Sequence, residues 1–226
     1  QSTRVRERRE RLTHSCEPME ERVVRQQSRR TVLVTGASSG IGYELAKLFA
    51  QDGYRVVLVA RNQDALERLA HELSAQHGAV MTILSTDLSR PGAPEEIIAA
   101  LKRSATEIDV LVNNAGFGLY GAFAGIPLAA QLEMIQVNLV ALTHLTKLLL
   151  PSMLARGHGK ILNVASTAAF QPGPLMAVYY ATKAYVLSFS EALANELRER
   201  GVTVTALCPG PTATGFQQRA SMGKIR

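Results

Sequence analysis

The chain has 226 residues, of which 46% are apolar and 19% charged, so it suits one soluble α/β domain whose core needs no disulfide bridges. Its two cysteines, Cys16 and Cys208, indicate a reducing compartment. No C-x-x-C or H-E-x-x-H spacing occurs. We therefore expect a cytoplasmic protein without a metal site.

The net charge of +6 is uneven along the chain. Residues 1–30 carry nine Arg and five Glu, whereas residues 31–226 carry 16 Lys or Arg and 14 Asp or Glu. A basic arm can bind nucleic acid or anionic lipid. The five glutamates dilute its positive field, so we expect a solvated, partly helical extension and no nucleic-acid partner.

The sequence also argues against a membrane span. The longest apolar candidate, "VNLVALTHLTKLLLP", is interrupted by His144 and Lys147 and falls short of the roughly 20 apolar residues that a spanning helix needs. The first twenty residues are polar and charged, which is not the pattern of a signal peptide.

From residue 31 onwards, short runs rich in β-branched residues alternate with stretches whose pattern predicts helices. Strands are predicted at 31–35, 54–60, 79–85, 108–113, 159–165 and 202–207, and helices at 40–52, 62–77, 94–105, 128–156 and 175–200. This alternation predicts a doubly wound parallel β-sheet, the Rossmann fold, in one domain over 31–226 with helices on both faces. Ligands of such sheets bind beyond the carboxyl ends of the strands, so we expect functional residues in the loops that follow them.

The loop after the first strand reads "TGASSGIG", residues 35–42. Its glycines permit a tight turn and a close approach of the backbone to a ligand, and the next helix directs its N-terminal N–H groups at the same place. Glycines also occur in tight turns that bind nothing, but this position favours dinucleotide binding. The residues predicted to contact the dinucleotide are Gly36, Ser38, Ser39, Gly40, Ile41 and Gly42.

The next three loops extend this predicted site. Arg61 follows the second strand where an NAD site would usually place an acid, so NADP(H) is favoured over NAD(H), unless Arg61 is only a surface residue. Asp87 and Leu88 follow the third strand and could contact the adenine, although Asp87 could equally cap a turn. In "NNAG", Asn113 and Asn114 are expected to tie loops together, while Ala115 and Gly116 pass close to the cofactor.

Six ordered motifs resemble the short-chain dehydrogenase/reductase family over about residues 31–216: "TGASSGIG", "NNAG", "VNLVA", "NVAST", "YYATK" and "CPGPTAT". The likeness is to NADP-type bacterial oxidoreductases. The resemblance implies hydride transfer between a nicotinamide and a carbonyl or alcohol. It also implies that Pro209, Gly210, Thr212 and Thr214 border the nicotinamide.

The "YYATK" stretch leaves a choice between two tyrosines. Residues four apart on a helix are offset by about 40° and residues three apart by about 60°, so Tyr179 and Tyr180 could both neighbour Lys183. The family pattern Y-x-x-x-K implies Tyr179, and Ser166 lies thirteen residues before it, as in the family. A phenol with a pKa near about 10 is a poor proton donor and acceptor at neutral pH, and we expect the Lys183 ammonium to lower that pKa.

The resemblance also implies the remaining roles. Ser166 donates to the substrate oxygen, Lys183 bonds the nicotinamide ribose, and Asn138 holds a water in a relay to Lys183. A serine hydrolase is excluded, because no G-x-S-x-G occurs and no histidine follows a predicted strand. The apolar residues expected around the substrate favour a hydrophobic ketone or aldehyde: Phe117, Ala168, Phe170, Pro172, Leu175 and Met176.

Relatives of this kind usually continue for tens of residues beyond the position of Thr214. We therefore expect the substrate lid and last strand to be missing, and the sheet edge to be uncovered. This leaves two alternatives open, a cofactor-binding protein with little activity and a non-enzymatic binding module. Helices over about 136–156 and 175–200 are apolar on more than one face, which, with the resemblance, favours a homodimer or homotetramer.

Overall fold

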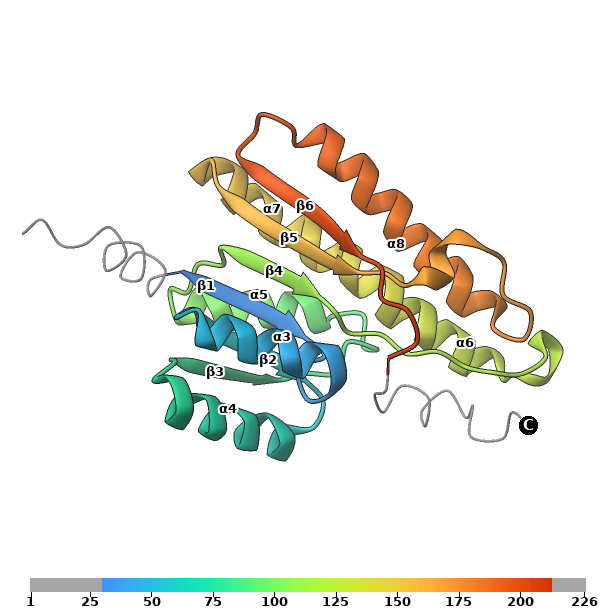
Figure 1. Cartoon of the computed structure of the whole chain (residues 1–226), viewed down its shortest axis with the longest axis horizontal. Helices are drawn as coiled ribbons and strands as arrows, with labels where there is room; N and C mark the ends of the chain where they lie inside the picture. Colours follow the sequence, from blue (N-terminus) through green and yellow to red (C-terminus); the bar gives the residue numbers. More distant parts are fainter. Residues whose placement is uncertain (1–29, 213–226) are drawn as a thin grey trace, which may run out of the picture.

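The computed structural model describes residues 30–212, which form one parallel sheet with helices on both faces (Figure 1). The strand order is β3-β2-β1-β4-β5-β6, and every neighbouring pair is parallel. The strands are β1 (Thr31–Thr35), β2 (Arg55–Ala60), β3 (Met81–Ser85), β4 (Val110–Asn113), β5 (Gly159–Val164) and β6 (Val202–Leu207). The predicted fold class, a doubly wound parallel sheet, is confirmed.

Within residues 30–212, two of the six α-helices pack on one face of the sheet and three on the other. The helices are α3 (Gly40–Gln51), α4 (Gln63–His77), α5 (Ala93–Arg103), α6 (Leu128–Ile135), α7 (Leu142–Arg156) and α8 (Ala177–Glu196). Because side chains alternate along a strand, Val32 and Val34 of β1 pack with α3 and α4, whereas Leu33 packs with α5 and α7. Figure 1 shows α3 in front of the sheet and α5 and α7 behind it.

The predicted helix over 128–156 is present but contains a wider turn. A π-helical segment, η2 (Gln136–Ala141), joins α6 to α7, and Asn138 is buried in it. Such turns are frequent at functional sites. The predicted helix over 175–200 ends at Glu196, and a turn follows in which Glu199 has a φ of 69°.

Among residues 30–212, one stretch, Leu128–Arg156, is long and apolar enough by length and composition to cross a membrane. This is weak evidence, because the core helix of a soluble protein passes the same test. Leu145, Leu149 and Met153 of this stretch lie in the core against the sheet. The expectation of no membrane span stays a prediction.

Strand β6 lies at the edge of the sheet within the described part of the chain. It pairs only with β5 there, and Thr203, Thr205 and Leu207 on one of its faces are exposed. The expectation of a missing lid and last strand, with an uncovered sheet edge, stays a prediction. The basic segment 1–29 and residues 213–226 lie outside the described residues.

Candidate active site

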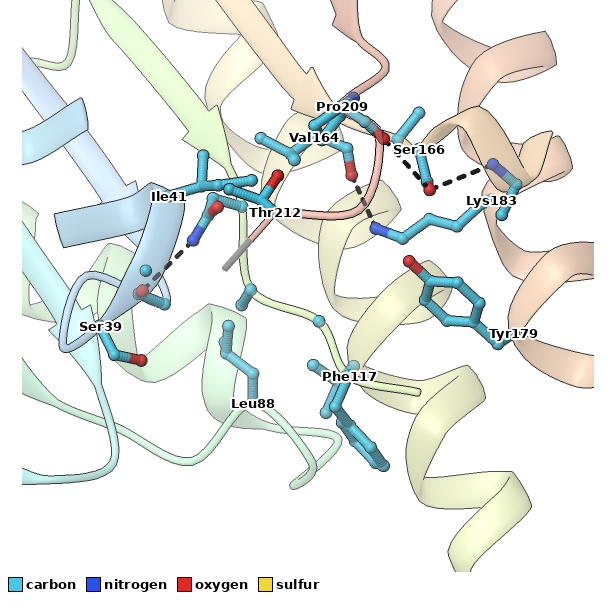
Figure 2. Close-up of a pocket in the computed structure, with 18 of the residues that line it drawn as sticks. Ser39, Ile41, Leu88, Phe117, Val164, Ser166, Tyr179, Lys183, Pro209 and Thr212 are labelled. Atoms are coloured by element: carbon cyan, nitrogen blue, oxygen red, sulfur yellow. Dashed lines mark hydrogen bonds between the residues drawn. The ribbon is translucent and has the colours of Figure 1, made fainter. Parts of the chain in front are cut away.

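A cavity of about 1030 Å³ lies at the carboxyl ends of the strands. This volume is at the upper end of the usual range for ligand pockets, about 300–1,000 Å³. In Figure 2, Ser39, Ile41 and Leu88 lie on one side of the pocket, and Ser166, Tyr179 and Lys183 on the other. All the predicted catalytic and cofactor-binding residues that the structure describes line this cavity, except Gly42 and Asn138. Thr214 lies outside the described residues.

The glycine loop between β1 and α3 is built to pass close to other backbone. Gly36 has a φ of 66°, and a Cβ there would lie 2.8 Å from Asn114 Nδ2. A Cβ on Gly42 would overlap both Gly36 O and Asn114 Nδ2. Gly42 is therefore needed for packing within the loop, not for lining the cavity. Ser39 is the N-cap of α3 and makes no side-chain capping bond, so its hydroxyl and the helix N-terminus are available to a phosphate.

Thr35, which the sequence analysis did not single out, connects the first and fourth loops. Its hydroxyl donates to Val112 O at 3.1 Å and accepts from the backbone N–H groups of Asn114 and Ala115 at 3.0 Å each. Asn114 completes the link by donating to Thr35 O at 2.9 Å. The only sequence signal for this role is a hydroxyl residue directly before the glycine loop.

The acidic and basic residues that follow β2 and β3 at one end of the cavity are partly paired with the protein itself. Arg61 Nη1 lies 3.7 Å from Glu133 Oε1 of α6. Asp87 Oδ1 accepts from Ser89 N at 3.0 Å, and the carboxylate also accepts from the Ser89 side chain, so Asp87 does cap a turn. Burial raises the pKa of Asp87, but the hydrogen bonds from Ser89 and the charges of Arg61 and Arg90 outweigh this, and the net pKa is lowered.

At the other end of the cavity, Tyr179, Lys183 and Ser166 converge from α8 and the end of β5. Lys183 Nζ donates to Val164 O at 2.7 Å and lies 5.9 Å from the centroid of the Tyr179 ring. Ser166 Oγ accepts from Ala168 N at 3.1 Å and also bonds with the Tyr179 hydroxyl. Figure 2 shows the Tyr179 hydroxyl and the Lys183 amine both directed into the pocket.

The expected direction of the Tyr179 pKa shift is wrong for the protein without ligand. Burial raises the pKa of Tyr179, the Ser166 hydrogen bond lowers it less, and the nearby Tyr180 adds to the increase. Only 8% of Tyr179 is exposed, so the cost of desolvating a phenolate dominates. Burial also lowers the pKa of Lys183 to about 8, against a smaller opposite effect of Cys208.

Asn138 holds the loop after β4 rather than lining the cavity. Its Nδ2 donates to Phe117 O at 2.9 Å and to Thr182 Oγ1 at 3.1 Å, while its Oδ1 accepts from Phe117 N at 3.1 Å. Both amide protons are therefore used. A water could bond only to the second lone pair of Oδ1 or to the Asn138 backbone carbonyl.

Tyr180 also lines the cavity, but its ring packs closely on Gly173, where a Cβ would overlap the ring. Phe117, Ala168 and Met176 line the cavity as predicted. Phe170 and Pro172 do not line it, and both are exposed. Leu175 borders a smaller neighbouring groove instead. Leu175 has a φ of 66°, and its carbonyl accepts from Gly121 N at 2.8 Å.

Comparison with known proteins gives the class to which this fold and site belong. A sequence profile described as short chain dehydrogenase matches residues 30–224. The chain therefore belongs to the short-chain dehydrogenase family. It is 36% identical over 181 residues to the ketoacyl reductase HetN of Nostoc sp., covering 80% of this chain and 63% of that protein's length.

Two solved structures extend the comparison. A short-chain dehydrogenase from Sphingobium yanoikuyae in complex with NADPH superposes with a TM-score of 0.81 and 38% identity, covering 85% of this chain and 75% of that one. A bulky-bulky ketone specific alcohol dehydrogenase from Comamonas testosteroni has a TM-score of 0.78 and 32% identity, covering 87% of this chain and 76% of that one.

Proposed function

We propose that this chain is an NADP(H)-dependent oxidoreductase that interconverts a carbonyl and an alcohol, with Tyr179 as the general acid and base. The observation that carries this proposal is the convergence of Tyr179, Ser166 and Lys183 at one end of a cavity whose other end is a glycine loop. Family membership supports the reaction class.

The residues present fit a dinucleotide. Side chains at Gly36 and Gly42 would collide with neighbouring backbone or Asn114, so the loop keeps the α3 N-terminus open to a pyrophosphate. Arg61 at the end of β2 supplies a guanidinium suited to a 2′-phosphate. The similar structure from Sphingobium yanoikuyae contains NADPH, which supports the same choice. When bound, the nicotinamide would supply or accept the hydride.

Tyr179 and Ser166 would hold the reacting oxygen. In reduction, the carbonyl oxygen accepts hydrogen bonds from both hydroxyls, and the Tyr179 proton moves to that oxygen as the carbonyl carbon gains the hydride. In oxidation, the same proton returns to Tyr179. Lys183, with a pKa of about 8, is protonated at neutral pH and would stabilise the transient phenolate.

We propose that Lys183 also binds the nicotinamide ribose, and that Asn138 positions the loop carrying Gly116 and Phe117. A Cβ on Gly116 would lie 3.1 Å from Asn138 Oδ1 and 3.6 Å from Lys183 Nζ, so the Asn138 amide and the Lys183 amine both lie close to Gly116. The relay water assigned to Asn138 would bond to its backbone carbonyl or Oδ1. Pro209, Gly210 and Thr212 line the cavity next to Ser166 and would border the nicotinamide, together with Thr214.

An apolar carbonyl compound is the substrate class that the walls favour. Met134, Ala168, Met176 and Tyr179 form one buried cluster, with Phe117 and Tyr180 packed against it. The similar proteins named above include a ketoacyl reductase and an enzyme for bulky ketones, which agrees with an apolar wall.

The organisation of the whole protein stays a proposal. We propose one catalytic domain over residues 31–226 behind a basic extension, in a cytoplasmic homodimer or homotetramer. Val140 of η2 and Tyr185 of α8 are exposed apolar residues on the helices expected to form the subunit contact.

The test is NADPH oxidation followed by absorbance with a panel of ketones and aldehydes. Tyr179→Phe should lower the rate by about 10²- to 10⁴-fold, the usual contribution of a positioned proton donor, without changing NADPH affinity. Tyr180→Phe is the matched control and should lower it less than about tenfold. If NADPH binds but no substrate turns over, the chain is a cofactor-binding protein with little activity, and the proposed reaction is wrong.

A further inference from the structure

The guanidinium of Arg61, which lines the cavity, pairs with a carboxylate of α6. Arg61 follows β2, whereas Glu133 lies on α6, more than seventy residues later in the chain. Their Nη1 and Oε1 atoms are 3.7 Å apart, and their side chains are 53% and 43% exposed. Arg61 lines the cavity. The pair therefore lies at an edge that a ligand and solvent can both reach.

A second acid adds to the negative field around Arg61. Asp87 lies close enough that Arg61 helps to lower its pKa, together with Arg90. Arg90 forms its own bidentate pair with Glu96, so it is partly neutralised. The carboxylates of Glu133 and Asp87 thus partly neutralise the Arg61 guanidinium. The end of the cavity at Arg61 is therefore less positive than an unpaired arginine would make it.

This arrangement matters for cofactor choice, and the argument rests on the proposed function. A 2′-phosphate would need the same guanidinium that Glu133 holds, and its negative charge would be repelled by Glu133 at close range. A dinucleotide with a free 2′-hydroxyl makes no such demand and leaves the pair intact. Glu133 therefore weakens the binding of one cofactor and not of the other.

We propose that Glu133 is a specificity-determining residue that reduces the preference for NADP(H) over NAD(H). It competes with the 2′-phosphate for Arg61. An exposed ion pair contributes little free energy, so the expected effect is modest, about two- to tenfold in affinity. The consequence is a protein that binds NADPH more weakly than Arg61 alone would allow and that accepts NADH to a measurable extent.

The experiment measures dissociation constants for NADPH and NADH by fluorescence titration, at low and at 0.2 M salt. Glu133→Gln should tighten NADPH binding by about two- to tenfold and change NADH binding by less than about twofold. The gain should shrink at the higher salt, where charges are screened. It should vanish when Arg61→Met is also present, because the guanidinium is then gone.

Glu95→Gln is the matched control, since it removes the same charge from a carboxylate that pairs with His144 at 3.1 Å and not with Arg61. An unchanged NADPH affinity in Glu133→Gln, an equal gain in Glu95→Gln, or a gain that persists in the Arg61→Met background overturns the inference alone. Failure of the wild-type protein to bind either dinucleotide would instead reject the proposed function, and this inference with it.

Discussion

Lys183 Nζ donates a 2.7 Å hydrogen bond to the carbonyl of Val164, the last residue of β5. The carbonyl of Val164 lies two residues before Ser166, and Lys183 lies one helical turn after Tyr179, so this bond holds the buried amine close to both. It satisfies one of the three ammonium protons, so two remain for a ligand or a water. The lysine is only 6% exposed, and its charge therefore costs stability until something binds it.

The buried amine should make folding stability depend on pH. Its pKa is lowered from 10.5 to about 8 in the folded protein, so the unfolded chain holds more protons between these values. The destabilising contribution is complete below pH 8 and fades as the pH rises towards 10.5, so stability should increase over that range. The total change is at most about 3.4 kcal/mol, from 1.36 kcal/mol per pKa unit between 8 and 10.5.

Urea unfolding at pH 7, 8 and 9.5 checks this, with Lys183→Met as the variant that should lack the increase. Lys160→Met removes an exposed lysine from β5 and should keep the wild-type trend. Parallel pH profiles for the wild type and Lys183→Met would show that the amine is not desolvated as the structure indicates.

The pH profile of the reaction should differ between its two directions. Burial raises the pKa of Tyr179, so the phenol is protonated at neutral pH in the free protein. Reduction needs the phenol, and its kcat/KM should be flat around neutrality. Oxidation needs the phenolate beside a protonated Lys183, so its kcat/KM should rise by about tenfold per pH unit up to about pH 8, the pKa of Lys183. An oxidation profile that is flat from pH 6 to 9 would contradict the raised pKa.

Gly42→Ala should destabilise the protein and weaken dinucleotide binding. The added methyl group would overlap Gly36 O and Asn114 Nδ2, so the glycine loop must shift. We expect a loss of about 1–3 kcal/mol of unfolding free energy, as for overpacking, and at least a tenfold weaker Kd for NADPH. Gly125→Ala, whose Cβ would meet nothing within 4 Å, is the control. Equal effects of the two substitutions on thermal unfolding would contradict the packing argument.

Thr35→Val should cost stability without changing the shape of the side chain. It leaves the N–H groups of Asn114 and Ala115 without the hydroxyl that accepts from them. An unsatisfied buried donor costs about 1–3 kcal/mol, so denaturant midpoints should fall clearly. Thr31→Val is the same change on the same strand, at a hydroxyl that makes no hydrogen bond with residues 30–212, and it should be nearly neutral. Similar losses in both variants would argue that β1 is merely sensitive to substitution.

Local patterns were enough to predict the sheet and most cavity-lining residues. Strand β1, the glycine loop and Lys183 are defined by residues close together in the sequence, and parallel topology brings the loops to one edge. The sign of the Tyr179 pKa shift could not be predicted, because it depends on burial by residues from other elements such as Met134.

The contacts that sequence could not supply join distant segments. Glu133 of α6 lies 3.7 Å from Arg61 although the two are far apart in the sequence, and no local motif marks that pairing. Thr35 looked like an ordinary strand residue, although it connects two loops. Phe170, the last residue of η3 (Thr167–Phe170), is exposed, which its side-chain type alone does not reveal.

The wide turn η2 sets the angular relation between α6 and α7. An α-helix rotates by about 100° per residue, and a π-helical turn rotates by less, so its six residues fix how far the later helix is turned about its axis. Met134 before the turn packs beside Tyr179, and Leu145 after it packs on the sheet. Deleting one residue between Met134 and Leu145 would rotate Leu145 by about a quarter of a turn around the helix axis relative to Met134. Met134 could then stay beside Tyr179, or Leu145 could stay in the core, but not both.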